Sequence, residues 1–276
     1  MQRLLLTIIS LLLIISPALA SADKTSEDYL KGKRHFAIMN PVSERIAQSV
    51  IKKALKKETK GKYKVKLNSY TLSSMKKGIF KDLEITGKHL EVNGIEIPYV
   101  KLMTITDYNW IDYNQTPVVF KSDMTFDYIM HLSENSINQA LQTTEYKKNL
   151  EKVNKRAYPI FMISDVRVKL RNDKMHIIME YNFPIKPAKK NRTFMVSSSL
   201  NVTNSKVKLT NIGFDNAYGS LPIEKVTNLV NLVDPLSFTL SLVDNKKCDG
   251  RFDSAKIEDD VVKIDGKIYI KKEDLK

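Results

Sequence analysis

The spacing of apolar residues along the chain first indicates a helix, which begins near Asn40 and ends before Gly61. Asn40 is a favoured N-cap residue, and Pro41 suits the first helical position because its missing N–H needs no partner there. Apolar residues then recur every three or four positions, namely Ile46, Val50, Ile51, Ala54 and Leu55. Lysines fill the positions that face away from them. We therefore expect an amphipathic helix that packs its apolar face against another element.

From Tyr63 onward the apolar residues alternate with polar ones, which is the period of a strand with one face in water. Segments of this kind span residues 63–67, 79–85, 90–95, 100–105, 125–132, 163–170, 174–183, 194–203, 206–214, 236–243, 261–264 and 267–270. Tight-turn pairs mark the hairpins, namely Asn93-Gly94, Asn172-Asp173, Asn204-Ser205 and Asp265-Gly266. Two more helices interrupt the strands, one that begins at the Ser133 cap and reaches to about Val153, and one that ends at Asp234-Pro235. Antiparallel strands with isolated helices predict an α+β fold.

The N-terminus has the layout of a secretory signal peptide. An apolar run follows Arg3, and Ala18-Leu19-Ala20 is a small-x-small cleavage signal. The run is shorter than the roughly 20 apolar residues of a membrane span, although an uncleaved anchor stays the alternative. We expect a signal peptide over 1–20, a flexible segment over 21–39 and a single domain over 40–276. The predicted location is the periplasm or another extracytoplasmic part of a bacterial cell envelope.

The chain is strongly basic, because 45 Lys and Arg residues against 31 Asp and Glu residues give a net charge of +14. The lysines are spread along the sequence, which suits a solvated surface and also attraction to anionic lipid headgroups. Export argues against nucleic acid, the other usual partner of a basic chain. Cys248 is the only cysteine, so no intramolecular disulfide can form and stability must come from the core.

Motifs of catalysis and metal binding are missing from the sequence. Four histidines lie far apart and none has a zinc-binding spacing: His35, His89, His131 and His176. No Gly-x-Ser-x-Gly elbow and no phosphate-binding glycine loop occurs. Asp249-Gly250 and Asp259-Asp260 lack the alternating acidic ligands of a calcium loop, so we interpret them as turn residues. The sequence predicts no enzyme, metal or cofactor, although residues distant in sequence can still assemble a triad.

Many strands carry large, flexible apolar side chains, such as Met124, Phe126, Met179 and Phe183. Met and Phe suit adaptable apolar binding sites. Core packing accounts for most buried apolar residues in any protein, and on composition alone it is the favoured interpretation. Composition by itself therefore leaves both a lipid groove and an ordinary core open.

The segment from Ser74 to Ile85, Ser-Met-Lys-Lys-Gly-Ile-Phe-Lys-Asp-Leu-Glu-Ile, resembles the opening of the LmeA-like phospholipid-binding family of bacterial envelope proteins. Gly94-Ile95-Glu96-Ile97 resembles the next strand pair of that family, the Ser133 helix its internal helix, and residues 259–266 its final hairpin. The resemblance implies a highly curved antiparallel sheet rolled around helices, as in the half-barrel of tubular lipid-binding (TULIP-like) proteins. It also implies phospholipid binding in the cell envelope, with no catalytic residues.

We predict an exported envelope protein that binds phospholipid in an apolar groove and supports lipid transfer or envelope biogenesis. The groove is expected between the Asn40 helix, the Ser133 helix and the concave sheet face. Its candidate lining residues are Ile46, Val50, Phe126, Ile137, Leu141, Met179, Phe183 and Phe214. An anionic membrane surface is the second expected partner. Replacing Ile137 or Leu141 by Asp is expected to abolish lipid retention while the domain stays folded.

Two other functions fit the sequence. An envelope assembly protein would bind another protein through the same apolar face, in which case the core is filled and no lipid can be extracted. A cryptic hydrolase acting on lipid or glycan would need a histidine and a carboxylate brought together in space. Bound lipid and the placement of the histidines separate these alternatives.

Overall fold

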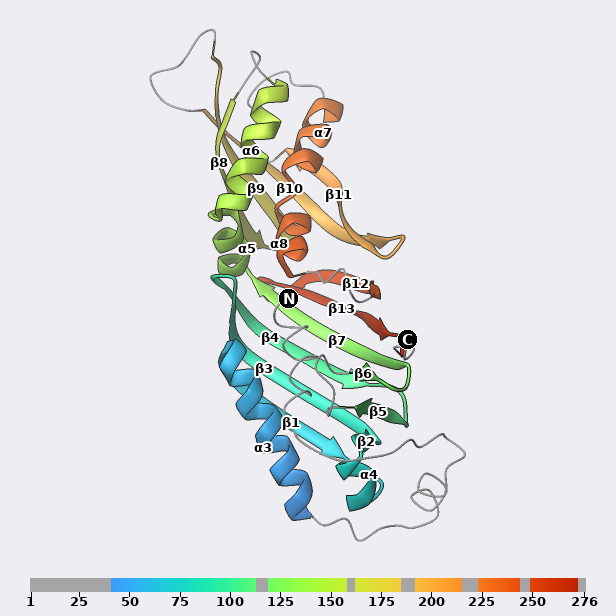
Figure 1. The fold of residues 1–276 in the computed structure, drawn as a ribbon. Coiled ribbons are helices and arrows are strands. Elements are labelled where there is room, and N and C mark those ends of the chain that lie inside the picture. Colours follow the sequence, from blue (N-terminus) through green and yellow to red (C-terminus); the bar gives the residue numbers. More distant parts are fainter. Residues whose placement is uncertain are drawn as a thin grey trace.

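The protein, described here by a computed structural model, is an α+β structure of antiparallel sheets and helices (Figure 1). This confirms the predicted fold class at the coarse level. The structure describes residues 41–112, 119–157, 162–184, 192–214, 223–243 and 249–272. The predicted signal peptide and the flexible segment lie outside these ranges, as do His35 and Cys248.

Helices and strands alternate in blocks along the chain. The described helices are α3 (Pro41–Glu58), α4 (Leu72–Lys76), α5 (Glu134–Leu141), α6 (Thr144–Ala157), α7 (Ile223–Val233) and α8 (Pro235–Val243). The strands before α5 are β1 (Lys60–Asn68), β2 (Ile79–Phe80), β3 (Asp82–Val92), β4 (Ile95–Thr104), β5 (Asn109–Asp112), β6 (Val119–Phe120) and β7 (Met124–Ser133). The strands after α6 are β8 (Met162–Arg171), β9 (Lys174–Asn182), β10 (Arg192–Thr203), β11 (Lys206–Phe214), β12 (Asp249–Glu258) and β13 (Val261–Ile270).

The larger sheet has six strands in the order β1-β3-β4-β7-β13-β12, and neighbouring strands are antiparallel. Buried residues alternate with more exposed ones, most regularly in β7 and β13, so one face carries the core. The predicted turn at Asn93-Gly94 joins β3 to β4, with φ of 52° and 77° at the two residues. β1 and β12 are the two ends of this sheet, so its described strands form an open sheet and not a closed barrel.

Helix α3 lies along the β1 end of the six-stranded sheet (Figure 1). Ile51 and Leu55 are buried beneath it, at 3% and 0% exposure. Gln48 Nε2 donates a hydrogen bond to Leu67 O (3.4 Å), which ties the helix to the backbone of the end strand. α3 therefore shields an edge that would otherwise offer unpaired backbone groups to another chain.

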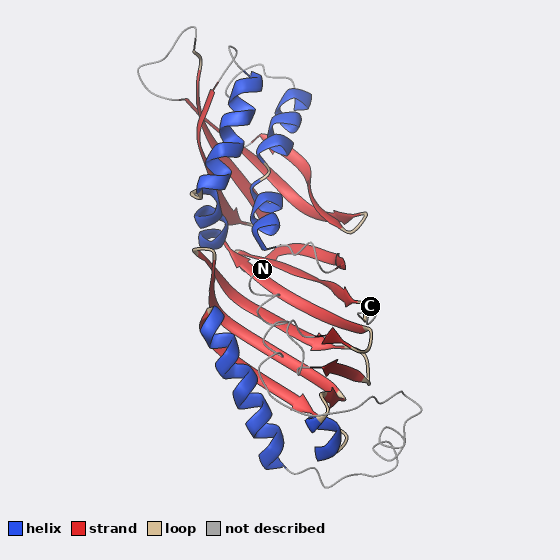
Figure 2. Ribbon diagram, in the orientation of Figure 1, coloured by secondary structure: helices blue, strands red, loops and turns tan. Residues whose placement is uncertain are grey.

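The second sheet has the order β11-β10-β9-β8 and is also antiparallel. The predicted turns at Asn172-Asp173 and Asn204-Ser205 join its hairpins, with positive φ at all four residues. Helices α5 to α8 lie on this half of the molecule, away from α3 (Figure 2). β12 packs against β10 and β11, so the two sheets meet there. Strands β2, β5 and β6 form a short third sheet.

Ser133 caps α5 as predicted. Its Oγ accepts from Ser136 N (3.1 Å), and Ser136 Oγ accepts from Ser133 N (3.1 Å). The sequence predicts one helix reaching to about Val153, whereas the structure has two. Gln142 N and Thr143 N both donate to carbonyls three residues back, which tightens and ends α5. Thr143 Oγ1 then accepts from the backbone N–H three residues on, at the start of α6.

The predicted strand over residues 236–243 is wrong, because these residues form helix α8. Apolar and polar residues alternate there, which is typical of a strand. Capping decides for the helix: Ser237 N donates to Asp234 Oδ1 (3.1 Å), and Pro235 occupies the first helical position. The buried residues of α8 have helical spacing, namely Pro235, Leu236, Thr239 and Leu240.

The predicted hairpin at Asp265-Gly266 is also wrong. β13 runs through both residues, and the turn lies at Asp259-Asp260, where φ is 54° and 56°. Gly266 instead permits close packing, since a Cβ there would lie 2.0 Å from Arg251 O and 2.9 Å from the Tyr128 ring. A glycine inside a strand can mark such a close approach as well as a turn.

Candidate functional site

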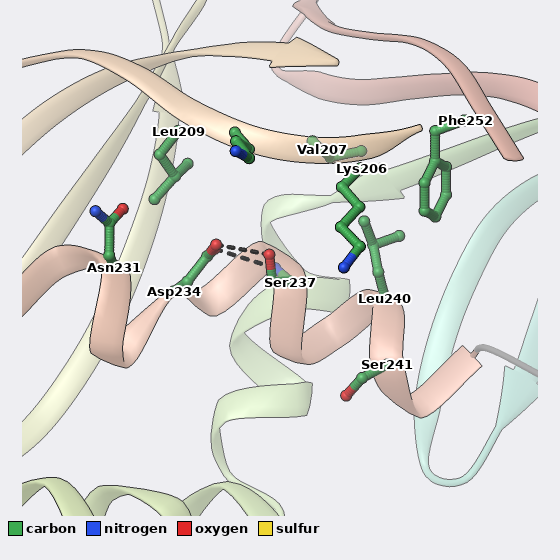
Figure 3. Close-up of a pocket in the computed structure, with 10 residues that line it drawn as sticks. Lys206, Val207, Leu209, Asn231, Asp234, Ser237, Leu240, Ser241 and Phe252 are labelled. Atoms are coloured by element: carbon green, nitrogen blue, oxygen red, sulfur yellow. Dashed lines mark hydrogen bonds between the residues drawn. The ribbon is translucent and has the colours of Figure 1, made fainter. Parts of the chain in front are cut away.

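A cavity of about 480 Å³ lies where the two sheets meet, between β11, the α7–α8 segment and β12 (Figure 3). Its size falls in the range of small-molecule sites, ~300–1,000 Å³. The lining residues are Lys206, Val207, Lys208, Leu209, Asn231, Asp234, Ser237, Leu240, Ser241 and Phe252. None of them is among the eight groove residues that the sequence predicts.

The cavity combines a buried apolar base with an exposed polar margin. Val207, Leu209 and Leu240 are 6%, 8% and 6% exposed. The exposed lining residues are Lys206, Lys208, Asn231, Ser237 and Ser241. Lys206 extends from β11 toward α8 (Figure 3). An amphiphile with an apolar chain and an anionic head matches this division, because lysine ammonium groups form charge-assisted hydrogen bonds with phosphate or carboxylate.

Phe252 forms the β12 wall of the cavity, and a β-bulge places it there. The pairing of β12 with β13 shifts between Phe252 and Ser254, which leaves Asp253 outside the ladder and bends the strand. Phe252 lies opposite Gly266, and its ring meets the Tyr128 ring edge-on with 6.4 Å between centroids. The missing side chain of Gly266 thus makes room for the Tyr128 ring, against which the Phe252 ring packs.

Asp234 joins α7 to α8 at the edge of the cavity. Its N–H donates to Val230 O (2.8 Å), and its Oδ2 accepts from Ser237 Oγ (2.6 Å), so the residue ends one helix and caps the next. Burial raises the pKa of the Asp234 carboxyl, although the hydrogen bonds from Ser237 act in the opposite direction. The side chain is half-buried, so its carboxyl group meets both the protein interior and the cavity.

Tyr146 of α6 fixes the two helices that line the cavity. Its hydroxyl donates to Val233 O at the end of α7 (3.1 Å), and its ring lies 4.9 Å from the Phe238 ring of α8. Burial raises the pKa of the Tyr146 hydroxyl, and the nearby carboxylates of Asp234 and Asp165 raise it further. The hydroxyl therefore stays protonated and keeps its role as a hydrogen-bond donor.

Four of the predicted groove residues belong to the core. Phe126, Ile137, Leu141 and Met179 are 4%, 0%, 3% and 0% exposed and lie in one hydrophobic cluster. Helix α5, which carries two of them, packs against β4, β7, β8 and α8. None of the four lines the cavity at β11, so their observed role is packing.

The other four are not brought together with them. Ile46 is 61% exposed and Val50 is half-buried, because α3 turns the stripe Ala47-Ile51-Leu55 toward the sheet. Phe183 is half-buried just after β9 and stacks edge-on with Tyr181, at 5.5 Å. Phe214 ends β11, and its side chain lies outside the described part of the structure. The eight residues therefore do not line a common groove among the described residues.

One signal in the sequence, the Asp234-Pro235 cap, could have indicated which residues of α8 line the cavity. With residues 236–243 predicted as a strand, Leu240 and Ser241 fall on opposite faces. A helix that starts at the Asp234-Pro235 cap places Ser237, Leu240 and Ser241 on one side, because residues three and four apart are neighbours on a helix. The lining residues from β11 and β12 could not be predicted in this way, because their positions depend on how the two sheets pack, and no local sequence pattern indicates that packing.

His89 forms a histidine–carboxylate pair, which is the kind of pair that a hydrolase would need. His89 Nδ1 lies 2.8 Å from Glu96 Oε1, but the two side chains are 66% and 43% exposed on the β3–β4 hairpin and do not line the cavity. His131 stacks on Tyr99 at 4.8 Å, and burial lowers its pKa, with the charge of Lys263 acting in the same direction. Among the described residues, no group of three or more His, Cys, Asp or Glu side chains could hold a metal ion.

Comparison of the chain with protein-family models, with curated proteins and with solved structures found no match. In the part of the chain that the structure describes, no helix is long and apolar enough to cross a bilayer. The resemblance to LmeA-like proteins therefore stays a prediction, and the cavity becomes the main physical guide to function.

Proposed function

We propose that this protein binds a phospholipid in the extracytoplasmic cell envelope, supports lipid transfer or envelope biogenesis, and has no catalytic step. An acyl chain would lie against Val207, Leu209 and Leu240, with the phosphate near Lys206 and Lys208. The half-barrel arrangement of TULIP-like proteins, in which a curved sheet encloses lipid, belongs to the same proposal. The observation that carries it is the cavity between β11, α8 and β12, with its buried apolar base and exposed basic margin.

The apolar base is expected to supply most of the binding free energy. Each methylene group that leaves water contributes ~0.8 kcal/mol. The lysines are exposed, so their interaction with a phosphate is screened by solvent and adds orientation more than affinity. The net charge of +14 supports attraction to an anionic membrane surface, the second proposed partner.

Native mass spectrometry of the protein purified from an envelope fraction, followed by organic extraction, tests this function. We expect phospholipid bound at near-integer stoichiometry. A clean apo mass, with no uptake after incubation with anionic liposomes, would instead favour the assembly protein that binds another protein.

A variant pair locates the lipid. Asn231→Trp places a large side chain at the exposed margin of the cavity and should reduce the amount of bound phospholipid. Asn228→Trp is the matched control, because Asn228 is also exposed on α7 but does not line the cavity. Equal phospholipid loading of the two variants would mean that the lipid lies elsewhere in the protein.

A further inference from the structure

The outward face of α3 is a cluster of cations. Its exposed basic residues are Arg45, Lys52, Lys53, Lys56 and Lys57. Among the described residues, no acidic side chain forms an ion pair with them, whereas on neighbouring β1 Lys60 pairs with Glu91 and Lys66 with Glu84. The charge on this face of α3 is therefore available to an anionic partner.

An exposed apolar residue lies within this cluster. Ile46 is 61% exposed, and with Val50, Lys53 and Lys57 it follows the spacing i, i+4, i+7 and i+11, so these side chains share one stripe of the helix. The opposite stripe is buried on the sheet, namely Ala47, Ile51 and Leu55. Because that stripe is fixed, Ile46 cannot reach the core without unfolding this part of the protein.

We infer that the outward face of α3 is a docking surface for an anionic lipid bilayer. The lysines would lie against the headgroups and Ile46 would enter the boundary with the acyl chains, as apolar residues of interfacial helices do. An acidic protein surface would also attract the lysines of α3. It would not bury Ile46, whereas the acyl chains of a bilayer can. The inference deepens the proposed function and rests on the envelope location that it assumes.

The docked orientation has a consequence for the cavity. α3 lies along β1, and one wall of the cavity is β12, which is the opposite end of the same sheet (Figure 1). A protein held to a bilayer by α3 would therefore keep its cavity away from that surface. The cavity would then face the aqueous side of the envelope, where a second membrane or a partner could exchange lipid with it.

Helix α6 offers a matched control. It is also basic, with Lys147, Lys148, Lys152 and Lys155 exposed. It lies on the other half of the molecule from α3 (Figure 2). Replacing four lysines by Gln, at positions 52, 53, 56 and 57 in one variant and at 147, 148, 152 and 155 in the other, removes the same charge from each helix. Both variants should stay folded, since Gln and Lys have similar helix propensities.

The test is co-sedimentation of the purified full-length protein with phosphatidylcholine vesicles that contain phosphatidylglycerol. The α3 variant should lower the partition coefficient at least ~10-fold, while the α6 variant should change it by less than about twofold. Ile46→Ser should lower it by about threefold, since one apolar side chain leaves the interface. Wild-type protein should not sediment with pure phosphatidylcholine, and high salt should release it from the mixed vesicles.

Equal losses in the α3 and α6 variants would assign vesicle binding to overall charge and overturn the docking surface, as would unchanged binding of the α3 variant. Native mass spectrometry of the same samples keeps this result apart from the proposed function. The α3 variant should keep its bound phospholipid, and Asn231→Trp should keep its vesicle binding. Absence of phospholipid from every sample would contradict the proposal that the cavity binds lipid. The vesicle data would still test whether α3 is the docking surface.

Discussion

Helices α5 and α8 pack against each other in the middle of the molecule, but α5 is enclosed and α8 is open on one side. α5 also packs against strands of both sheets, and Ile137 on its inner face is 0% exposed. α8 buries Leu236 at 1% exposure, yet Ser237 and Ser241 on its other side are exposed and line the cavity. Both helices are short, so length does not explain the difference.

The neighbouring strands explain it. α5 lies where β4, β7 and β8 supply side chains from hydrogen-bonded ladders on both sides of the junction. α8 lies near β11 and β12, which end two different sheets and are not hydrogen-bonded to each other, whereas β4 and β7 beside α5 are interior strands of one sheet. The cavity lies between these two unpaired strands and α8. Apolar residues alone therefore do not locate the cavity in this protein; the place where the two sheets meet does.

The largest expected difference between α5 and α8 is the loss of stability when an apolar or polar residue is replaced by Asp. Ile137→Asp places a carboxylate where no water reaches, and we expect a loss of ~4 kcal/mol or more in the free energy of unfolding, which is enough to unfold many domains. This replaces the earlier expectation that the domain stays folded with Asp at this position. Urea unfolding followed by circular dichroism measures the loss.

Ser241→Asp is the counterpart on α8. Because Ser241 is exposed at the cavity margin, the same new charge should cost no more than about 1 kcal/mol, chiefly because a negative charge near the C-terminal end of α8 is unfavourable. A similar loss of stability in both variants would mean that α8 is as enclosed as α5, and the cavity would then not be open in solution.

The cavity beside α8 also depends on Gly266, which lies opposite Phe252 of the cavity wall. Gly266→Ala drives a methyl group against Arg251 O and the Tyr128 ring, so β12 must shift, and we expect ~1–3 kcal/mol of destabilisation. Because Phe252 lies opposite Gly266, the variant should also carry less phospholipid. Gly250→Ala on β12 is the control, since a Cβ there meets nothing within 4 Å. Unfolding curves that coincide for the two variants would contradict this account of Gly266.

Local signals in the sequence predict helix α5 and the hairpins around it. Asn93-Gly94 and Asn172-Asp173 mark their turns because both residues of each pair tolerate positive φ. Ser133 marks the start of α5 because its side chain satisfies a free N–H of the first turn. These interactions involve residues within a few positions of one another, so a local pattern is enough to state them.

The α8 side depends on contacts that are distant in sequence. Alternation in residues 236–243 predicts a strand, and only the Asp234-Pro235 cap indicates the helix. Asp265-Gly266 has the composition of a turn, but the approach of Tyr128 and Arg251 makes it part of a strand. The cavity itself combines β11, α8 and β12, which are brought together only by the meeting of two sheets. Packing between two sheets produces no periodic pattern of apolar residues, so the sequence alone does not predict it.

The smallest expected effect concerns Asp234, where the open side of α8 begins. Burial raises the pKa of its carboxyl above the ordinary value of 3.8, so the folded state binds the proton more tightly than the unfolded chain does. The contribution of Asp234 to stability should therefore fall as pH rises from about 4 through the raised pKa and then level off. Asp234→Asn keeps a good N-cap but cannot ionise, so the wild type should be more stable relative to this variant at about pH 4 than at about pH 7. Urea unfolding of both proteins at the two pH values measures the difference. A difference that grows toward neutral pH would mean that the ionised carboxylate is stabilised by its hydrogen bonds with Ser237 more than burial opposes it.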